Sequence, residues 1–257
     1  MRGEVCIGIG SIFSFTSLIL LIFVHVGQIS LSNVPRNIFM VKVNMSAYGQ
    51  NIAAAIAPNP VFGLYTNNAS APLNDQQGLR QFYEFGLYSY CAYVEPKAGT
   101  CSNHTAGQTF KPYDIVTSDM LANFSRLSAT PLIPLDLTFK DSKYLGQTSR
   151  AAYWLLLLGT ICAALALITG IAKNNLTLSF SSIISTIGAL FLLIAASLWT
   201  VLIKKAQAIN TATQALNGEP VGITVSEGNG LFLTWAAFVC LFISVIPYVL
   251  SCCTFRG

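Results

Sequence analysis

Few residues in this chain have types that could do chemistry, and their spacing does not gather them into a catalytic set. The two histidines are His25, at the edge of an apolar run, and His104, inside an Asn-x-Thr sequence. Asp114 and Asp119 form a close acidic pair in the long segment that follows that run, and we expect both at the surface. Because an enzyme needs a nucleophile, a base and charge-stabilising groups at one site, we predict a non-enzymatic protein without cofactor or metal.

Two of the seven cysteines stand apart from the others. Only Cys91 and Cys101 lie in the long segment, and the nine residues between them let a hairpin bring the pair into bonding range. A disulfide there would close a loop of about ten residues and stabilise the folded state by roughly 2–3 kcal/mol. A zinc site is disfavoured, because two thiols lack a convergent pair of histidines.

The remaining cysteines lie in or at the ends of apolar runs. Cys162 and Cys240 are interpreted as small buried apolar residues. Cys252 and Cys253 end the last apolar run just before Arg256, where S-acylation commonly occurs. Both are therefore candidate acylation sites.

Five Asn-x-Ser/Thr sequences could accept N-linked glycans. Four of them lie in the long segment and are predicted to be glycosylated outside the cytosol: Asn44, Asn68, Asn103 and Asn123. The fifth, Asn175, falls in a short turn between two apolar runs, too near a membrane to be a good acceptor.

The composition indicates which structural elements surround these residues. Hydrophobic residues make up 53% of the chain and charged residues only 9%, whereas about a quarter of the residues of a soluble chain are charged. Four apolar runs are each long enough to cross a bilayer as a helix. A cleavable signal peptide is the alternative for the first run, but its apolar stretch exceeds the usual length of about 7–15 residues, which favours an uncleaved anchor. We predict transmembrane helices at residues 5–29, 151–173, 180–203 and 230–253.

Small residues recur at helix-contact spacing in three of these runs, and such rows let helix backbones approach closely. They are Gly10 and Ser14, Ala166 and Gly170, and Ser181, Ser185 and Ala189. We predict that these rows pack the protein's own bundle, with a partner's helix as the alternative.

Two rules disagree on which side of the membrane the loops lie. The positive-inside bias would place the loops that contain Lys42 and the Lys204 and Lys205 pair in the cytosol. The glycosylation sequences and the paired cysteines indicate the opposite side, which is oxidising, and segments longer than about 60 residues translocate with little regard to charge. We therefore predict cytosolic termini, with the loops at 30–150 and 204–229 outside.

The long loop is predicted to form a β-sheet with little helix. Alternating or β-rich pieces occur at Val41–Val43, Phe82–Val94 and Leu132–Phe139, and a helical piece at Ala47–Ala57. These pieces give the loop enough apolar residues for a small domain.

Strand alternation in the middle piece gives two faces. Core packing is predicted for Tyr83, Phe85, Leu87 and Ser89. Because tyrosine is favoured at interfaces, the candidate partner surface is the other face, with Phe82, Tyr88 and Tyr90.

The residues around the first paired cysteine read Phe85-Gly86-Leu87-Tyr88-Ser89-Tyr90-Cys91, followed by Cys101. This element resembles the Gly-Leu-Trp…Cys…Cys signature of the claudin-like superfamily, with Tyr88 where claudins have Trp. The closer resemblance is to the fungal Sur-seven/PalI family of tetraspan plasma-membrane proteins, which also have a glycine-flanked approach to the last span, here Gly222–Thr224 and Gly228–Ala237. The resemblance implies a membrane α-helical fold: a four-transmembrane-helix bundle with a claudin-like extracellular β-sheet domain.

The same resemblance implies a function. Family members are associated with plasma-membrane microdomains linked to eisosomes and with cell-wall and membrane integrity. This implies an organiser that acts through membrane lipids and other integral membrane proteins, or by self-association. Two alternatives stay open: an accessory subunit that supports a multi-span protein such as an ambient-pH sensor, as in the PalI branch, and a Fig-like calcium-influx factor. The formal charge of +4, spread without a basic run, predicts no nucleic-acid partner.

Overall fold

The computed structural model describes residues 2–55, 63–95, 98–122, 124, 137–171, 175–214 and 218–254. The chain divides into two compact units. The helical unit comprises Met1–His25, Ala151–Leu198 and Gly230–Gly257, and the sheet unit comprises Val26–Arg150 and Trp199–Asn229. Each unit is therefore assembled from segments that are far apart in the sequence.

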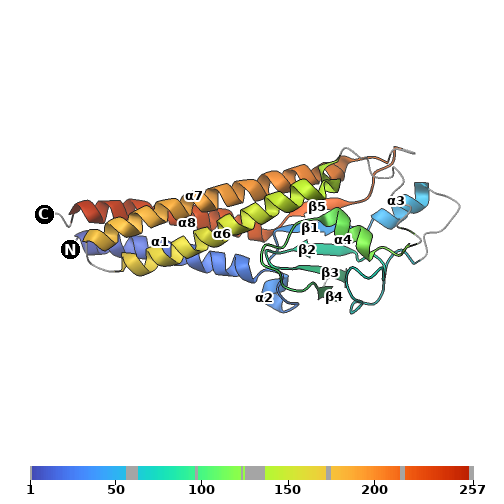
Figure 1. The fold of residues 1–257 in the computed structure, drawn as a ribbon, viewed down its shortest axis with the longest axis horizontal. Helices are drawn as coiled ribbons and strands as arrows, with labels where there is room; N and C mark the ends of the chain where they lie inside the picture. Colours follow the sequence, from blue (N-terminus) through green and yellow to red (C-terminus); the bar gives the residue numbers. More distant parts are fainter. Residues whose placement is uncertain are drawn as a thin grey trace. The chain divides into compact units, whose positions relative to one another are not determined.

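Four long helices supply the helical unit: α1 (Arg2–Val26), α6 (Ser142–Gly170), α7 (Asn175–Ala206) and α8 (Asn229–Thr254). Figure 1 shows them running alongside one another as a bundle. Within the described residues, four stretches are long and apolar enough to cross a membrane: Val5–Val26, Ser142–Gly170, Thr177–Thr211 and Asn229–Leu250. The predicted membrane fold with four spans is confirmed.

The helices do not begin and end where the apolar runs do. α6 begins at Ser142, earlier than predicted, because the Asp141 carboxylate accepts a hydrogen bond from the Tyr144 backbone N–H (2.9 Å) and caps the helix. α1 and α7 also differ in their bounds from the predicted 5–29 and 180–203. The length of an apolar run determines how many helical residues can lie in the membrane. The helix itself begins and ends where capping groups satisfy its terminal backbone groups, which can be outside that run.

Small residues let the helices of this unit approach closely. Tyr248 of α8 lies against Gly10 of α1 and Gly170 of α6, where an added Cβ would come within 2.9 and 2.5 Å of its side-chain atoms. The Tyr248 hydroxyl also forms a hydrogen bond with Ser14 Oγ (3.2 Å). These small residues therefore serve the chain's own bundle, as predicted.

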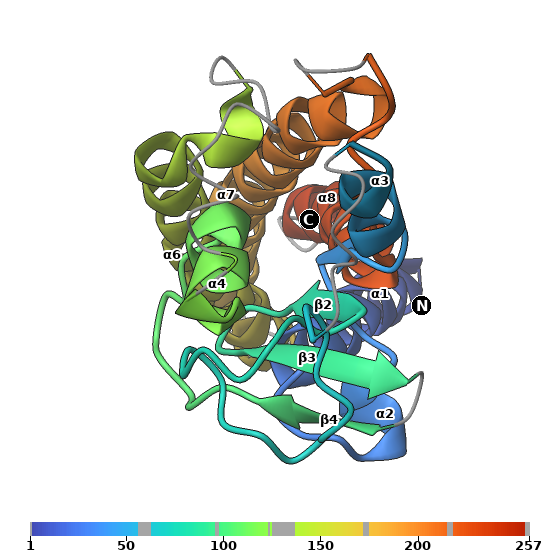
Figure 2. The same ribbon diagram turned by 90° about the vertical axis from the view of Figure 1, so that its right-hand side faces the viewer.

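The sheet unit contains a five-stranded antiparallel sheet in the order β4-β3-β2-β1-β5 (Figure 1). Figure 2 shows its strands β2, β3 and β4 from another side. The strands of the sheet are β1 (Val41–Asn44), β2 (Phe82–Phe85), β3 (Tyr90–Glu95), β4 (Ala98–Cys101) and β5 (Thr224–Glu227). β5 comes from the segment between α7 and α8, and it pairs with β1 from Val41 opposite Glu227 to Asn44 opposite Thr224. Both extramembrane segments thus contribute to one sheet.

Short helices complete the sheet unit. They are α2 (Asn33–Arg36), α3 (Tyr48–Ala55), α4 (Pro112–Asp119) and two 3₁₀ helices at Thr138–Lys140 and Gln207–Thr211. The strand predicted near Val41 and the helix predicted from Ala47 are confirmed by β1 and α3, whereas α4 was not predicted.

Two strand predictions need correction. The piece at Phe82–Val94 is not one strand but two, β2 and β3, joined by a turn at residues 86–89. In the piece at Leu132–Phe139, residues 132–136 lie outside the described residues, and the end of the piece belongs to a 3₁₀ helix. β-rich composition alone does not show where a strand turns.

Aromatic side chains fill the core of the sheet unit. The rings of Phe85 and Phe110 meet edge to face with centroids 4.9 Å apart, and the Phe110 centroid lies 6.4 Å from that of Trp199. Trp199 is fully buried in this core, although its place in an apolar run predicted a membrane position. The last turns of α7 therefore belong to the sheet unit, where large aromatic rings contribute much of the buried apolar area.

Candidate functional site

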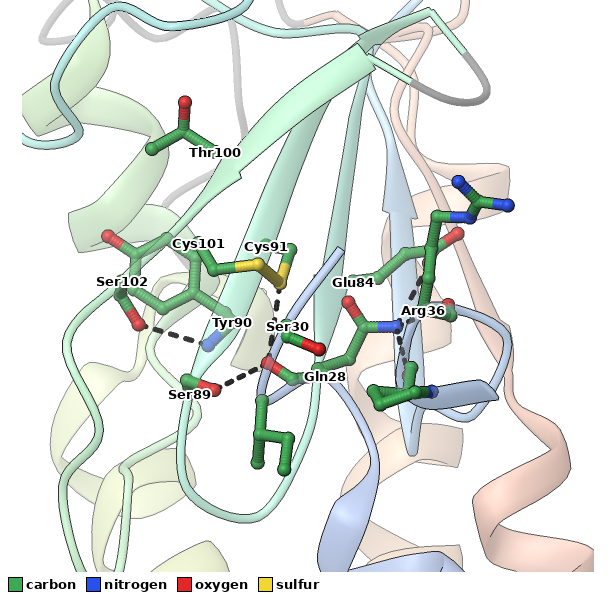
Figure 3. The surroundings of a disulfide bond; sticks show 12 residues. Gln28, Ser30, Arg36, Glu84, Ser89, Tyr90, Cys91, Thr100, Cys101 and Ser102 are labelled. Carbon is green, nitrogen blue, oxygen red and sulfur yellow. Dashed lines mark hydrogen bonds between the residues drawn. A yellow bond between two sulfur atoms is a disulfide. The ribbon is translucent and has the colours of Figure 1, made fainter. Parts of the chain in front are cut away.

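Cys91 and Cys101 form a disulfide (S–S 2.02 Å) across the β3–β4 hairpin, where they are direct register partners (Figure 3). Cys91 is fully buried. The pairing continues beyond the disulfide, since the Ser102 N–H donates to the Tyr90 carbonyl (2.8 Å) and Ser102 Oγ accepts from the Tyr90 N–H (3.1 Å). The predicted disulfide is confirmed.

The turn before β3 contains Gly86, Leu87 and Tyr88. The Gly86 N–H donates to the Ser89 carbonyl (2.9 Å) and closes the turn. Leu87 is buried and Tyr88 is half-buried. A Cβ added to Gly86 would come within 2.4 Å of the Gly27 carbonyl oxygen. Only glycine therefore lets this turn lie against the chain that leaves α1.

Gly86→Ala should destabilise the sheet unit by about 1–3 kcal/mol, because the backbone on one side of the contact must shift to admit the methyl group. The matched control is Gly8→Ala in α1, where an added Cβ meets nothing within 4 Å. Urea unfolding followed by proteolysis of the unfolded fraction measures both midpoints. Equal midpoints for the two variants would contradict the steric explanation.

Gln28, two residues after the end of α1, is a site residue that the sequence analysis missed. It is fully buried, and its side-chain Nε2 donates to the Arg36 carbonyl (2.6 Å) while its Oε1 accepts from the Tyr93 hydroxyl (3.1 Å). Its backbone carbonyl accepts from the Ser89 hydroxyl (2.5 Å) and lies 3.3 Å from Cys91 Sγ (Figure 3). Gln28 thus joins α2, β3 and the disulfide. No local pattern marks a glutamine in this role.

Asp119 is not a surface carboxylate, and its predicted position is wrong. It is fully buried at the end of α4, where its Oδ2 forms an ion pair with Nη1 of the equally buried Arg80 (2.9 Å). The Tyr83 hydroxyl donates to the same oxygen (2.9 Å), and the Asn74 backbone N–H donates to Oδ1 (2.6 Å). Burial, followed by the nearby Asp119 charge, raises the pKa of Tyr83, so its hydroxyl stays a donor. Burial of both charges is possible because each finds partners.

The other candidates for chemistry lie apart from one another. Asp114 is exposed and accepts a hydrogen bond from Ser142 Oγ (2.6 Å). His104 is exposed, with Nε2 2.7 Å from a backbone carbonyl oxygen, and His25 Nε2 lies 2.9 Å from a threonine hydroxyl of α6. In the part of the chain that the structure describes, no three His, Cys, Asp or Glu side chains are grouped to hold a metal ion.

Of the two predicted aromatic faces, the structure confirms the core face and corrects part of the partner face. The residues predicted for the core are all buried: Tyr83, Phe85, Leu87 and Ser89. On the predicted partner face, Phe82 and Tyr88 are half-buried, but Tyr90 is only 2% exposed and its hydroxyl accepts from the Asn74 side-chain amide (2.9 Å). Burial raises the pKa of Tyr90 to about 12. Tyr90 is thus a core residue, because the turn at 86–89 interrupts the expected alternation.

The candidate glycosylation sites lie at strand ends and in loops. The side-chain oxygens of Asn44 and Asn68 accept the backbone N–H of the residue two positions on, at 2.9 and 3.0 Å. This leaves the amide nitrogen, which would carry the glycan, on the other side of the carboxamide. Asn68 and Asn103 are exposed and Asn44 is half-buried. Asn123 lies outside the described residues.

The cysteines of the apolar runs lie in membrane helices. Cys252 and Cys253 belong to the last turns of α8, and their acylation stays a prediction. Cys162 and Cys240 are half-buried and not fully buried as predicted. A half-buried position on a helix of a membrane bundle leaves one side of the residue for lipid.

Comparisons with known proteins place these features in a family context. The profile of the SUR7/PalI family matches residues 6–253, nearly the whole chain. The match takes in both units, including the disulfide hairpin and the glycine-flanked β5. A comparison with curated proteins gave no match.

Proposed function

Because the chain belongs to the SUR7/PalI family, we propose that it acts by association, as a non-enzymatic plasma-membrane tetraspan that organises a microdomain. The family is one of membrane proteins. The four long apolar helices of this chain make it a multi-pass membrane protein. The proposed role is of the eisosome-associated type and serves cell-wall and membrane integrity. It operates through lipids and partner proteins.

The observation that carries this proposal is that the ionisable side chains of the sheet unit that could have been catalytic take part in structural contacts. The groups that could have been catalytic have structural partners: Asp119 binds Arg80, Asp114 accepts from a serine hydroxyl, and His104 lies within hydrogen-bond distance of a backbone carbonyl. The sheet itself is built from both extramembrane segments and held by a disulfide. A disulfide-held sheet whose candidate catalytic groups are already engaged in structural contacts suits binding to other molecules better than catalysis.

We further propose that both termini are cytosolic and that the sheet unit lies outside the cell. The disulfide supports this placement, because disulfides form and persist in oxidising compartments. The glycosylation sequences at exposed positions support it as well.

N-glycosidase treatment should shift the protein on a gel, since Asn68 and Asn103 are exposed on the sheet unit. Replacing each of these two by Gln should remove one glycan and therefore part of the shift. Asn210→Gln, at an asparagine outside any Asn-x-Ser/Thr sequence, is the control and should leave the shift unchanged. An unshifted wild-type protein from its own host, together with labelling of the long loop from the cytosolic side, would contradict the topology.

The distribution of the tagged protein in the plasma membrane tests the proposed function. The wild type should form stable patches with slow recovery after photobleaching, and Asp114→Ala and His104→Ala should keep them, because neither side chain supports the core. A diffuse wild type that co-purifies in a fixed ratio with one multi-span protein would favour the accessory-subunit role. Loss of function in Asp114→Ala or His104→Ala, with folding, location and partners intact, would contradict a non-enzymatic role.

A further inference from the structure

A cavity of about 260 Å³ opens on the sheet unit beside the disulfide, since its lining residue Glu84 is the register partner of Cys91. Its walls include two cationic side chains, Arg36 and Lys42, and two aromatic rings, Phe39 and Phe82. Glu84 also lines it. None of the residues discussed for glycosylation or acylation belongs to this cavity, so its composition needs an explanation of its own.

The charges of this cavity do not cancel. Lys42 Nζ pairs with Glu84 Oε1 at 3.0 Å and lies 4.4 Å from the centre of the Phe82 ring. The other Glu84 oxygen accepts from Gln28 Nε2 (3.3 Å), so this nearly buried carboxylate is compensated. Arg36 Nη2 donates to the neutral Asn33 Oδ1 (3.1 Å), and among the described residues no carboxylate lies within ion-pair distance of Arg36. The guanidinium charge is therefore left for a ligand.

The wall of the cavity is tied to the ends of two membrane helices. The Arg36 carbonyl accepts from Gln28, which follows the last residue of α1 by two positions. Asn229, the first residue of α8, donates to the Asn37 carbonyl (2.6 Å) and accepts from the Phe39 N–H (3.3 Å). The ends of apolar spans lie at the bilayer surface, so residues hydrogen-bonded to those ends lie near the depth of the lipid headgroups.

We propose that this cavity binds the phosphate of a phospholipid headgroup. A guanidinium presents paired N–H donors in a plane that matches two phosphate oxygens, and Lys42 supplies a second cation that Glu84 and Phe82 hold in place. The cavity is smaller than the range of about 300–1,000 Å³ that holds drug-sized ligands, which suits a headgroup whose acyl chains stay in the bilayer. The inference rests on the proposed function for its membrane setting and names the lipid group that the organiser would hold.

Retention of lipid by the full-length protein tests this site. The protein is reconstituted in phosphatidylcholine vesicles, extracted and washed in a maltoside detergent without phosphate, and its bound phosphatidylcholine is counted by mass spectrometry. Arg36→Gln should lower retention about fivefold, which corresponds to ~1 kcal/mol, the size of one net hydrogen bond from the protein to the headgroup. Lys143→Gln removes an equal charge from an exposed position outside the cavity and should retain lipid like the wild type.

Two further measurements complete the experiment. One uses a conservative variant as a control for misfolding, and the other distinguishes a lipid phosphate from a free phosphate ion. Arg36→Lys keeps the charge but removes the paired donors, so its retention should lie between those of the wild type and Arg36→Gln. Millimolar inorganic phosphate in the wash should displace little lipid from the wild type.

Wild-type retention by Arg36→Gln, or by Arg36→Lys where the Gln variant does not fold, would overturn the site. Complete displacement by inorganic phosphate would assign it to a free anion instead. Either result concerns the cavity alone, whereas a diffuse distribution of the wild type in the cell contradicts the proposed function whatever lipid it retains.

Discussion

Asp119→Asn should destabilise the sheet unit by about 3–5 kcal/mol, the usual effect of removing one partner of a buried ion pair. Asn is nearly the same size as Asp, so the substitution leaves no cavity. The loss comes from the fully buried guanidinium of Arg80, which no longer has a carboxylate to balance its charge. Arg80 Nη2 would still donate to the carbonyls of Ala71 and Pro72 (2.6 and 3.1 Å). These neutral acceptors stabilise a buried cation less than a carboxylate does.

The same urea and proteolysis measurement gives the midpoint for this variant. Asp114→Asn is the matched control, because that carboxylate is exposed and has one hydroxyl partner, so its replacement should change stability by about 1 kcal/mol or less. Adding Arg80→Met to Asp119→Asn should recover part of the loss, since it removes the uncompensated charge. If Asp119→Asn and Asp114→Asn unfolded at the same urea concentration, the buried pair would not contribute as described.

Removal of the Cys91–Cys101 disulfide should destabilise the sheet unit by about 2–3 kcal/mol, from the loop of about ten residues that the bond closes in the unfolded chain. Replacing either cysteine by Ala breaks the same bond. The variants Cys91→Ala, Cys101→Ala and the double variant should therefore unfold at similar urea concentrations, because the two side chains act as one unit. At the cell surface, a loss of this size should reduce the amount of protein several-fold.

Cys240→Ala is the control for the loss of a thiol, since Cys240 is a free cysteine of α8. The urea midpoint for unfolding of the sheet unit should be the same in this variant as in the wild type. Additive losses in the two single variants, with the double variant twice as destabilised, would show that packing of the separate side chains dominates and not the bond. Reduction of the wild type should reproduce the effect of the double variant without any change in sequence.

The sheet shows how far local patterns reach. β1 and α3 follow from the alternation near Val41 and the helical composition after Ala47, and both were predicted. β5 was missed, although a signal existed: buried Ile223 and Val225 alternate with exposed Thr224 and Ser226. Such an alternation predicts a strand but does not name its partner, and the pairing of β5 with β1 crosses most of the chain.

The candidate site likewise contains some residues that the sequence could identify and others that only the structure reveals. Cys91 and Cys101 could be paired from the sequence, because no other cysteine lies in the segment between the first two spans. Gly86 could be marked as a glycine that the family pattern requires, but only the structure shows the Gly27 carbonyl that excludes a Cβ. Gln28 gave no signal, since its role depends on groups from α2 and β3 that surround it.

The four membrane helices, the β-rich segment between the first two of them and the disulfide could be read from the sequence alone, whereas the strand β5 between the last two helices could not. Hydrophobic length is summed over neighbouring residues, so it can be read locally and decides membrane insertion before any tertiary contact forms. Only the folded structure shows that Asp119 is buried against Arg80, that Tyr90 is a core residue, and that Arg36 lines a cavity whose wall is hydrogen-bonded to Gln28 and Asn229. A polar side chain has no fixed place of its own, because its burial is favourable only where distant segments supply the matching charge or hydrogen bond.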